Sequence, residues 1–291
     1  MKKFLGFVFG MIIFTFLTVG ALGMIGHSYV LKTYDINIFT TVQALQALND
    51  PVDETKICPN AYSADDMLDV MSIVNDSVAG FITYTEENGY YINFDNLPAE
   101  MTDVITLSDK QVCAVAHEVV EQEINGKFNF GDKQVSVALK QIDFYDVTED
   151  SAHFNIVISV DMTPFKQVTD NEFANNLSSL IPDTMYVSST VIVVHGADNF
   201  SYDVKHESLT INNMTKEQTQ DLFHVLEVLF KTDSLATWNV YVGETIMHAL
   251  VGSETQQGLA YGLSGIGASD YAFVAEDGVE YFVVKRQNYK N

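Results

Sequence analysis

Two stretches of the chain begin with a short polar motif and continue as long segments in which apolar residues recur at regular spacing. The motifs are "SDKQV", beginning at Ser108, and "TKEQT", beginning at Thr215. Gln111 and Gln218 stand three residues after these hydroxyl residues, which is the pattern of a helix capping box. The first helix then shows the 3.6-residue period of an amphipathic helix, with Val112, Val115, Ala116, Val119, Val120 and Ile124 on one stripe. The second is apolar over most of its circumference, which predicts burial, through Leu222, Phe223, Val225, Leu226, Val228, Leu229 and Phe230.

Between these helices the pattern alternates with a period of two residues, which predicts β-strands. One strand places apolar residues on one face and polar residues on the other: Phe154, Ile156, Ile158, Val160 and Met162 against Asn155, Ser159 and Asp161. In the strand before it the alternation slips by one, from Val135, Val137 and Leu139 to Ile142 and Phe144. Such a slip predicts a β-bulge and a bent strand. The stretches "TMYVSSTVIVVHG" and "NFSYDVKHESLTI" predict a second long pair that leads into the Thr215 helix.

Shorter elements flank this part of the chain. Helices are expected over residues 40–50, after an N-cap at Ser63, and over residues 237–250. Hairpins are expected about the Asn88-Gly89 and Asp277-Gly278 turns. The stretch "GLAYGLSGIGASD" (258–270) matches neither a nucleophile elbow nor a dinucleotide-binding loop and is expected to be a flexible linker.

The N-terminus holds an uncharged apolar segment, "FLGFVFGMIIFTFLTVGALGMIG", over residues 4–26. At about 1.5 Å per residue it is long enough to span a hydrocarbon core of about 30 Å. Lys2 and Lys3 precede it, which predicts a cytoplasmic N-terminus and a translocated remainder. A cleaved signal peptide, with "ALG" as its site, is the alternative; such peptides have apolar cores of about 7–15 residues. We expect a retained single-pass anchor in the cell membrane.

These patterns predict an α+β fold. A transmembrane helix precedes an extracytoplasmic domain of long, bent antiparallel strands packed on amphipathic helices. The expected division is a cytoplasmic N-terminus (1–3), the anchor (4–26), a juxtamembrane stalk with a short helix (27–60), a helix plus hairpin (61–105), a core of helix and long strands (106–231), and a C-terminal helix and hairpin packed on that core (232–291).

The charge balance excludes one class of partner. The chain has 39 acidic against 15 basic residues, a formal net charge of −24, and Arg286 is its sole arginine. Such a chain repels nucleic acid and anionic headgroups. We therefore expect no nucleic-acid partner, and the sequence names no protein partner.

Candidate chemistry is sparse. His117 and Glu121 share a helix face at i, i+4, as zinc ligands do, but no third ligand is evident, so we expect no metal. The histidines show no triad pattern with Ser or Cys, so we expect neither an enzyme nor a cofactor. Cys58 and Cys113 could form a disulfide in an oxidising compartment or remain two separate thiols. The sequence leaves these two alternatives open.

Four stretches carry a family resemblance: "LSDKQVCAVAHEVV", "QVSVALKQIDF", "HFNIVISVDMTPF" and "IPDTMYVSSTVIV". Their pattern is similar to that of bacterial membrane-anchored proteins of the YpmS-like kind and, more distantly, to tubular lipid-binding (TULIP) domains. The resemblance implies a non-enzymatic protein that binds lipid or another acyl-chain ligand in an apolar groove. The groove candidates are Val112, Val115, Val119, Phe154, Ile156, Ile158, Val160, Leu222, Phe223, Leu226, Leu229 and Phe230.

The alternative is a cell-envelope scaffold or protein-interaction module without a ligand groove. In that case the same apolar residues only pack a core, which is the commoner role of apolar stripes.

Overall fold

The computed structural model describes residues 27–87, 89–124, 127–130, 133–148, 150–166, 182–230 and 233–287. The expected anchor, residues 4–26, and most of the connector after the second long strand, residues 167–181, lie outside these ranges. Among the helices of the described ranges, none is both long and apolar enough to cross a membrane.

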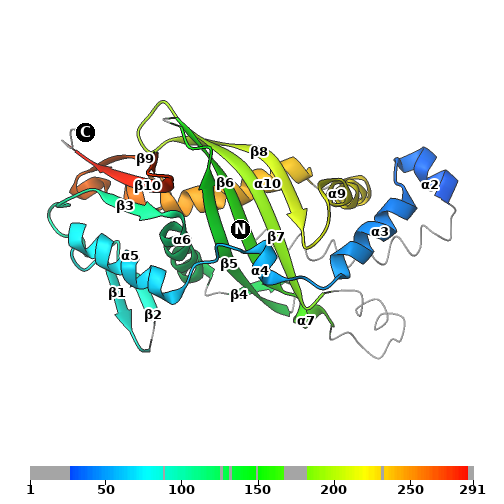
Figure 1. Ribbon diagram of the computed structural model, residues 1–291, viewed down its shortest axis with the longest axis horizontal. Helices are drawn as coiled ribbons and strands as arrows, with labels where there is room; N and C mark the ends of the chain where they lie inside the picture. Colours follow the sequence, from blue (N-terminus) through cyan, green and yellow to red (C-terminus); the bar gives the residue numbers. More distant parts are fainter. Residues whose placement is uncertain are drawn as a thin grey trace.

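A five-stranded antiparallel sheet forms the centre of the molecule (Figure 1). Its strands follow chain order: β4 (Lys127–Phe130), β5 (Lys133–Tyr145), β6 (Ser151–Asp161), β7 (Thr184–His195) and β8 (Tyr202–Ile211). The bulge predicted from the slipped alternation is confirmed, because the register of β5 on β6 shifts between Leu139 and Gln141. A second shift, where Thr190 and Val191 of β7 face β8, was not evident from the sequence.

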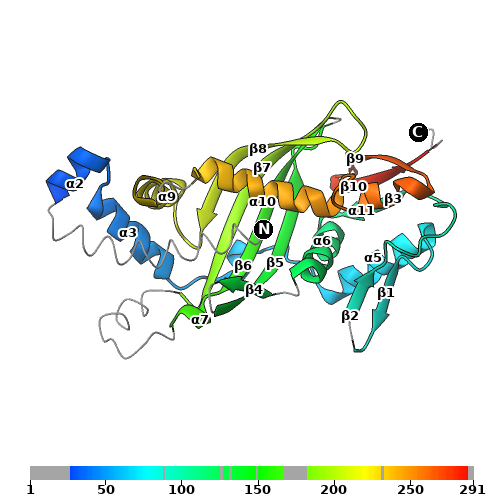
Figure 2. The same ribbon diagram turned by 180° about the vertical axis from the view of Figure 1, so that it is seen from behind.

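Two helices cover one face of this sheet, α6 (Asp109–Ile124) beside β5 and α10 (Leu235–Leu250) along β7 and β8 (Figure 2). Gly243 allows α10 to lie close, because a Cβ atom there would stand 2.7 Å from a methyl group of Val204. The opposite face, on which α4 (Glu54–Ile57) lies, is called the outer face below.

Both predicted capping boxes are formed. The backbone N–H groups of Ser108 and Thr215 donate to the Oε1 atoms of Gln111 and Gln218, each over 2.9 Å. The second boxed helix, α9 (Lys216–Phe230), nevertheless packs mainly on α3 (Ile38–Asn49) at the end of the sheet. Of the two boxed helices, α6 therefore lies on the sheet face, whereas α9 lies at the end of the sheet and α10 takes the second place on that face.

Smaller elements complete the fold at both ends. Helix α2 (His27–Tyr34) lies at one end, whereas α5 (Ala64–Ser77) and the predicted hairpin of β1 (Ile82–Thr85) and β2 (Gly89–Ile92) lie at the other (Figure 1). At the same end as α5, β9 (Ala268–Glu276) and β10 (Val279–Arg286) form the predicted closing hairpin, and β3 (Ile105–Ser108) pairs with β10. A short α7 (Thr163–Lys166) follows β6.

The glycine-rich stretch 258–270 is not a linker, which corrects the sequence-based expectation. It folds into α11 (Leu259–Gly262), a 3-10 turn (η1, Ser264–Ile266) and the start of β9. Its apolar side chains, those of Leu259, Ala260, Leu263 and Ile266, are buried. Burial of these side chains holds the stretch in place.

One apolar cluster, reaching from Ile36 to Val284, joins the sheets and the helices. Aromatic rings form its junction between the two larger sheets. The ring of Phe154 on β6 lies 4.7 Å from that of Phe144 on β5 and 5.2 Å from that of Phe273 on β9, centroid to centroid. The expected stalk also contributes to this cluster, through buried residues of α3 such as Leu45 and Leu48.

Candidate functional site

The outer face of the five-stranded sheet holds a cleft of about 560 Å³. We call it the outer cleft; it is lined by Glu54, His117, Glu121, Ser136, Val137, Ala138, Lys140, Ser159, Asp161, Thr184 and Tyr186. A second hollow of about 390 Å³ adjoins it and shares Thr184 and Tyr186. Together they fall within the usual size range of ligand sites, about 300–1,000 Å³.

Strand alternation explains the floor of the outer cleft. Ser159 and Asp161 stand two residues apart on β6, and Tyr186 and Thr184 are their register partners on β7. Residues at i and i+2 of a strand point to the same face. The alternation in the sequence places Ser159 and Asp161 on the polar side of their strand and does not by itself indicate a site.

Helix α4 forms the wall above this floor. Its N-cap is Asp53, whose Oδ1 accepts from the N–H of Thr55 over 3.2 Å. A small apolar cluster of Cys58, Val157 and Tyr186, with Val52 and Ile57 beside it, fixes the segment on the sheet. Glu54 of α4 then reaches Lys140 of β5, Oε1 to Nζ, over 3.1 Å.

The outer cleft is acidic. Lys140 is already paired with Glu54, which leaves the carboxylates of Glu121 and Asp161 without a basic side chain among the residues that line the cleft, apart from His117. Burial, then the charge of Glu54 and a hydrogen bond to that carboxylate, raise the pKa of Tyr186 to about 12, so its hydroxyl stays protonated and donates to Glu54. The arrangement suits a cationic group and repels phosphate and carboxylate.

His117 belongs to α6, which packs beside β5 and contributes His117 and Glu121 to the lining of the outer cleft. Its Nε2 lies 3.8 Å from Oε2 of Glu121, its ring packs 5.5 Å from that of Tyr62, and its Nδ1 is buried without a hydrogen-bond partner. Within the described ranges no group of three His, Cys, Asp or Glu side chains could hold a metal. Burial lowers the pKa of His117, against the opposing charge of Glu121.

We expect this histidine to make the protein less stable in mild acid. Because folding lowers its pKa from 6.5, the unfolded chain binds a proton there before the folded chain does. The free energy of unfolding should therefore fall as the pH falls below about 6.5, by at most about 1.4 kcal/mol per pH unit. Urea titrations at several pH values should show this slope, and His117→Gln should reduce it to the part that His206, whose pKa burial also lowers, contributes.

The neighbouring Glu118 is expected to affect the pH dependence of the free energy of unfolding in the opposite direction. Burial raises its pKa from 4.5, so its contribution to stability falls as the pH rises through that range. The variant Glu118→Gln should therefore leave the slope just below pH 6.5 in place. If the slope were unchanged in His117→Gln, His117 would not be the cause of the loss of stability in mild acid.

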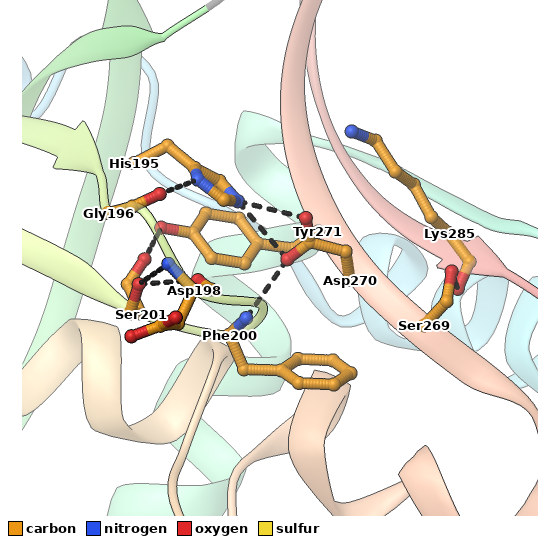
Figure 3. Close-up of polar contacts among 9 residues, drawn as sticks. All are labelled: His195, Gly196, Asp198, Phe200, Ser201, Ser269, Asp270, Tyr271 and Lys285. Carbon is orange, nitrogen blue, oxygen red and sulfur yellow. Dashed lines mark hydrogen bonds and ion pairs between the residues drawn. The ribbon is translucent and has the colours of Figure 1, made fainter.

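A second polar cluster joins the turn after β7 to β9 (Figure 3). His195 Nε2 lies 3.1 Å from both carboxylate oxygens of Asp270, and its Nδ1 lies 2.7 Å from the carbonyl oxygen of Gly196. The N–H of Phe200 donates to the same carboxylate over 3.0 Å. Ser201 is close by, so the residue types of a catalytic triad meet here, with Asp270 coming from far along the chain to His195 and Ser201.

The geometry of this cluster is that of a structural clamp. The Ser201 hydroxyl donates to the carbonyl of Asp198 and accepts from the N–H of Asp198 over 3.1 Å. Both ring nitrogens of His195 already face oxygen acceptors, so neither is left to take a proton from Ser201. The cluster ties the β7–β8 turn to β9.

The predicted groove residues are brought together, but as packed core. Nine of the twelve have described side chains, and all nine are buried, at most 7% exposed: Val112, Val115, Val119, Phe154, Ile156, Ile158, Val160, Leu222 and Phe223. The side chains of Leu226, Leu229 and Phe230 lie outside the described part of the structure. A ligand among the nine would have to displace side chains that already fill the space.

The two cysteines are free thiols in this structure, so the disulfide that the sequence allowed is not formed in it. Cys58 lies in the small outer-face cluster and Cys113 in the main core. Burial raises the pKa of Cys58 to about 11 and that of Cys113 as well, which keeps both protonated and unreactive at neutral pH.

Comparisons of the chain with protein-family models, with curated proteins and with solved structures found no match. The resemblance to YpmS-like and tubular lipid-binding proteins therefore stays a prediction.

Proposed function

We propose that this chain is a non-enzymatic, membrane-anchored protein of the extracytoplasmic side of the cell membrane, and that it holds a basic segment of a protein partner in its outer cleft. The observation that carries this proposal is the contrast between two sets of residues. The apolar groove candidates with described side chains are closed into the core, whereas the outer cleft is open, polar and acidic.

The carboxylates that line the outer cleft require a partner segment with basic side chains. A lysine or arginine side chain would pair with the carboxylates of Glu121 and Asp161, which line the cleft. Exposed ion pairs contribute only about 0–1 kcal/mol each, so several together have to give the affinity. The formal net charge of −24 would add long-range attraction for a basic partner.

Binding of an acyl chain in an apolar groove is the rival proposal. It rests on the family resemblance and on the expected position of the domain beside lipid. It requires space among side chains that are closely packed in this structure. The stability measurement at the start of the Discussion separates it from a packed core.

The direct test uses the full chain in phosphatidylcholine nanodiscs, because this zwitterionic lipid does not itself attract a cationic peptide. The probe is octalysine, and its dissociation constant is measured by fluorescence anisotropy. We expect the double variant Glu121→Gln, Asp161→Asn to weaken binding about tenfold, equal to about 1.4 kcal/mol. The amide oxygen of the asparagine would still accept the 2.9 Å hydrogen bond that the N–H of Thr163 donates to Asp161, so the fold should persist.

The matched control is Glu86→Gln, Glu87→Gln. It removes the same amount of charge from exposed positions beside the β1–β2 turn, away from the outer cleft. We expect less than about a twofold change for this pair, because long-range effects of single surface charges are screened beyond about 10 Å. Equal losses in the two double variants would show that octalysine senses only the net charge, and the proposal would fail.

A further inference from the structure

The end of the molecule that follows the expected anchor exposes a set of apolar side chains. Helix α2 begins at His27, directly after residues 4–26, and α3 follows it. The set, which we call the α2–α3 surface, consists of Tyr29, Leu31, Tyr34, Phe39 and Val42. The exposed fraction is 58% for Tyr29 and 67% for Phe39, which is unusual for large apolar side chains gathered on two consecutive helices.

The opposite face of α3 explains why these residues are left outside. Ile38, Thr41, Ala44, Leu45 and Leu48 recur at helical spacing and are buried, and α3 packs on α9. Phe39 and Val42, three residues apart, therefore point away from the core. Asn37 caps the helix, its Oδ1 accepting from the N–H of Phe39 over 3.0 Å, so this orientation is fixed from the first turn.

Charge distinguishes the α2–α3 surface from the rest of the chain. Asp35 is the sole acidic residue before Asp50, and Lys32 balances it, although the whole chain carries 39 acids. The acid-rich rest of the domain repels anionic headgroups, whereas residues 27–49 carry no formal net charge. Tyrosine is also enriched at membrane interfaces, where its ring is buried and its hydroxyl remains among the headgroups.

From position, exposure and charge together, we infer that the α2–α3 surface lies in the headgroup region of the membrane that holds the anchor. This inference rests on the proposed membrane anchoring. It gives the domain one orientation: α2 and α3 contact lipid, and the hairpin of β9 and β10, at the other end of the molecule, points away from the bilayer (Figures 1 and 2). The outer cleft then lies between the two ends, open to a partner.

The experiment places a tryptophan at one of two matched positions in the full chain. Val42→Trp lies on the α2–α3 surface, and Val274→Trp lies on β9 at the far end; the two valines are 38% and 40% exposed. Each variant is reconstituted in phosphatidylethanolamine–phosphatidylglycerol liposomes whose acyl chains carry bromine near the carbonyl end, which quenches nearby indole rings. The parent protein, with buried Trp238, gives the baseline.

We expect bromolipid to quench the tryptophan at position 42 about three times as strongly as that at position 274, because only the first would reach the interface. Equal quenching at both positions, or none at position 42, would overturn the inference. A position-42 tryptophan that is shielded from bromolipid in a dimeric protein would overturn it too, since a second copy would then cover the surface. If Val42→Trp fails to fold, Tyr34→Trp serves as the second probe.

Flotation of the same liposomes separates this test from that of the proposed function. Protein that does not float with the liposomes would refute the anchoring itself. Protein that floats but shows no quenching at position 42 would refute only the placement of the α2–α3 surface. Octalysine binding at the outer cleft is a third, independent result.

Discussion

Replacing Phe154 by alanine is expected to lower the free energy of unfolding by about 3–5 kcal/mol. The side chain is fully buried, and its ring contacts Phe144 on the neighbouring strand and Phe273 on the other sheet. Removing it would leave a cavity where the two sheets meet, and the rigid strands around it can close the gap only in part. Urea unfolding of the full chain, followed by circular dichroism, measures the loss.

The same measurement decides between a packed core and an acyl-chain groove. If Phe154 lined a groove that is empty without ligand, its removal would cost little, because few contacts would be lost. Tyr91 on β2 is 50% exposed and serves as the surface control. We expect Tyr91→Ala to lower the free energy of unfolding by about 0.5 kcal/mol. A loss for Phe154→Ala as small as this would contradict the packed core and favour the acyl-chain proposal.

Features that depend on neighbouring residues could be predicted from the sequence. The capping boxes at Ser108 and Thr215 involve residues three apart, and both are formed as expected. The bulge in β5 follows from a slip in alternation that is visible within a few residues. The turn at Asp277 and Gly278 has positive φ at both residues, 51° and 79°, which such a pair tolerates.

Features that depend on pairing between distant segments of the chain could not be predicted from the sequence. Nothing in the alternation predicts that β3 pairs with β10, because the two strands lie far apart along the chain. The choice of α10 over α9 for the sheet face depends partly on Gly243, whose missing Cβ lets the helix approach Val191 and Val204. A lone glycine in a helical pattern does not show which surface it will meet.

The outer cleft was missed for a similar reason. Its walls come from α4, α6 and three strands, which meet only in the folded chain. The available signal was the polar side of β6, with Ser159 and Asp161 at alternate positions of a strand whose other face is apolar. A polar strand face usually meets solvent, so this signal predicts exposure and does not predict a cleft.

A second large loss in the free energy of unfolding is expected for a substitution at Gly258. This residue lies in the stretch that was expected from the sequence to be a flexible linker. A Cβ atom at this position would stand 2.5 Å from the backbone nitrogen and 2.7 Å from the Cα of Gly252, and would also meet the carbonyl oxygen of His248. Backbone atoms cannot rotate aside as a side chain can. We expect Gly258→Ala to lower the free energy of unfolding by about 3 kcal/mol, near the upper end of the usual cost of overpacking.

Gly265→Ala is the matched control, because it lies in the same stretch and a Cβ atom there would meet nothing within 4 Å. We expect it to change the free energy of unfolding by less than about 0.5 kcal/mol. A linker would tolerate alanine equally at both positions, so equal small effects in urea unfolding would contradict the packed arrangement. A large loss at Gly258 alone would show that the turn after α10 is pressed against the chain leading to β9. Helix α10 would then be fixed at its C-terminal end by backbone contact as well as along the sheet by Gly243.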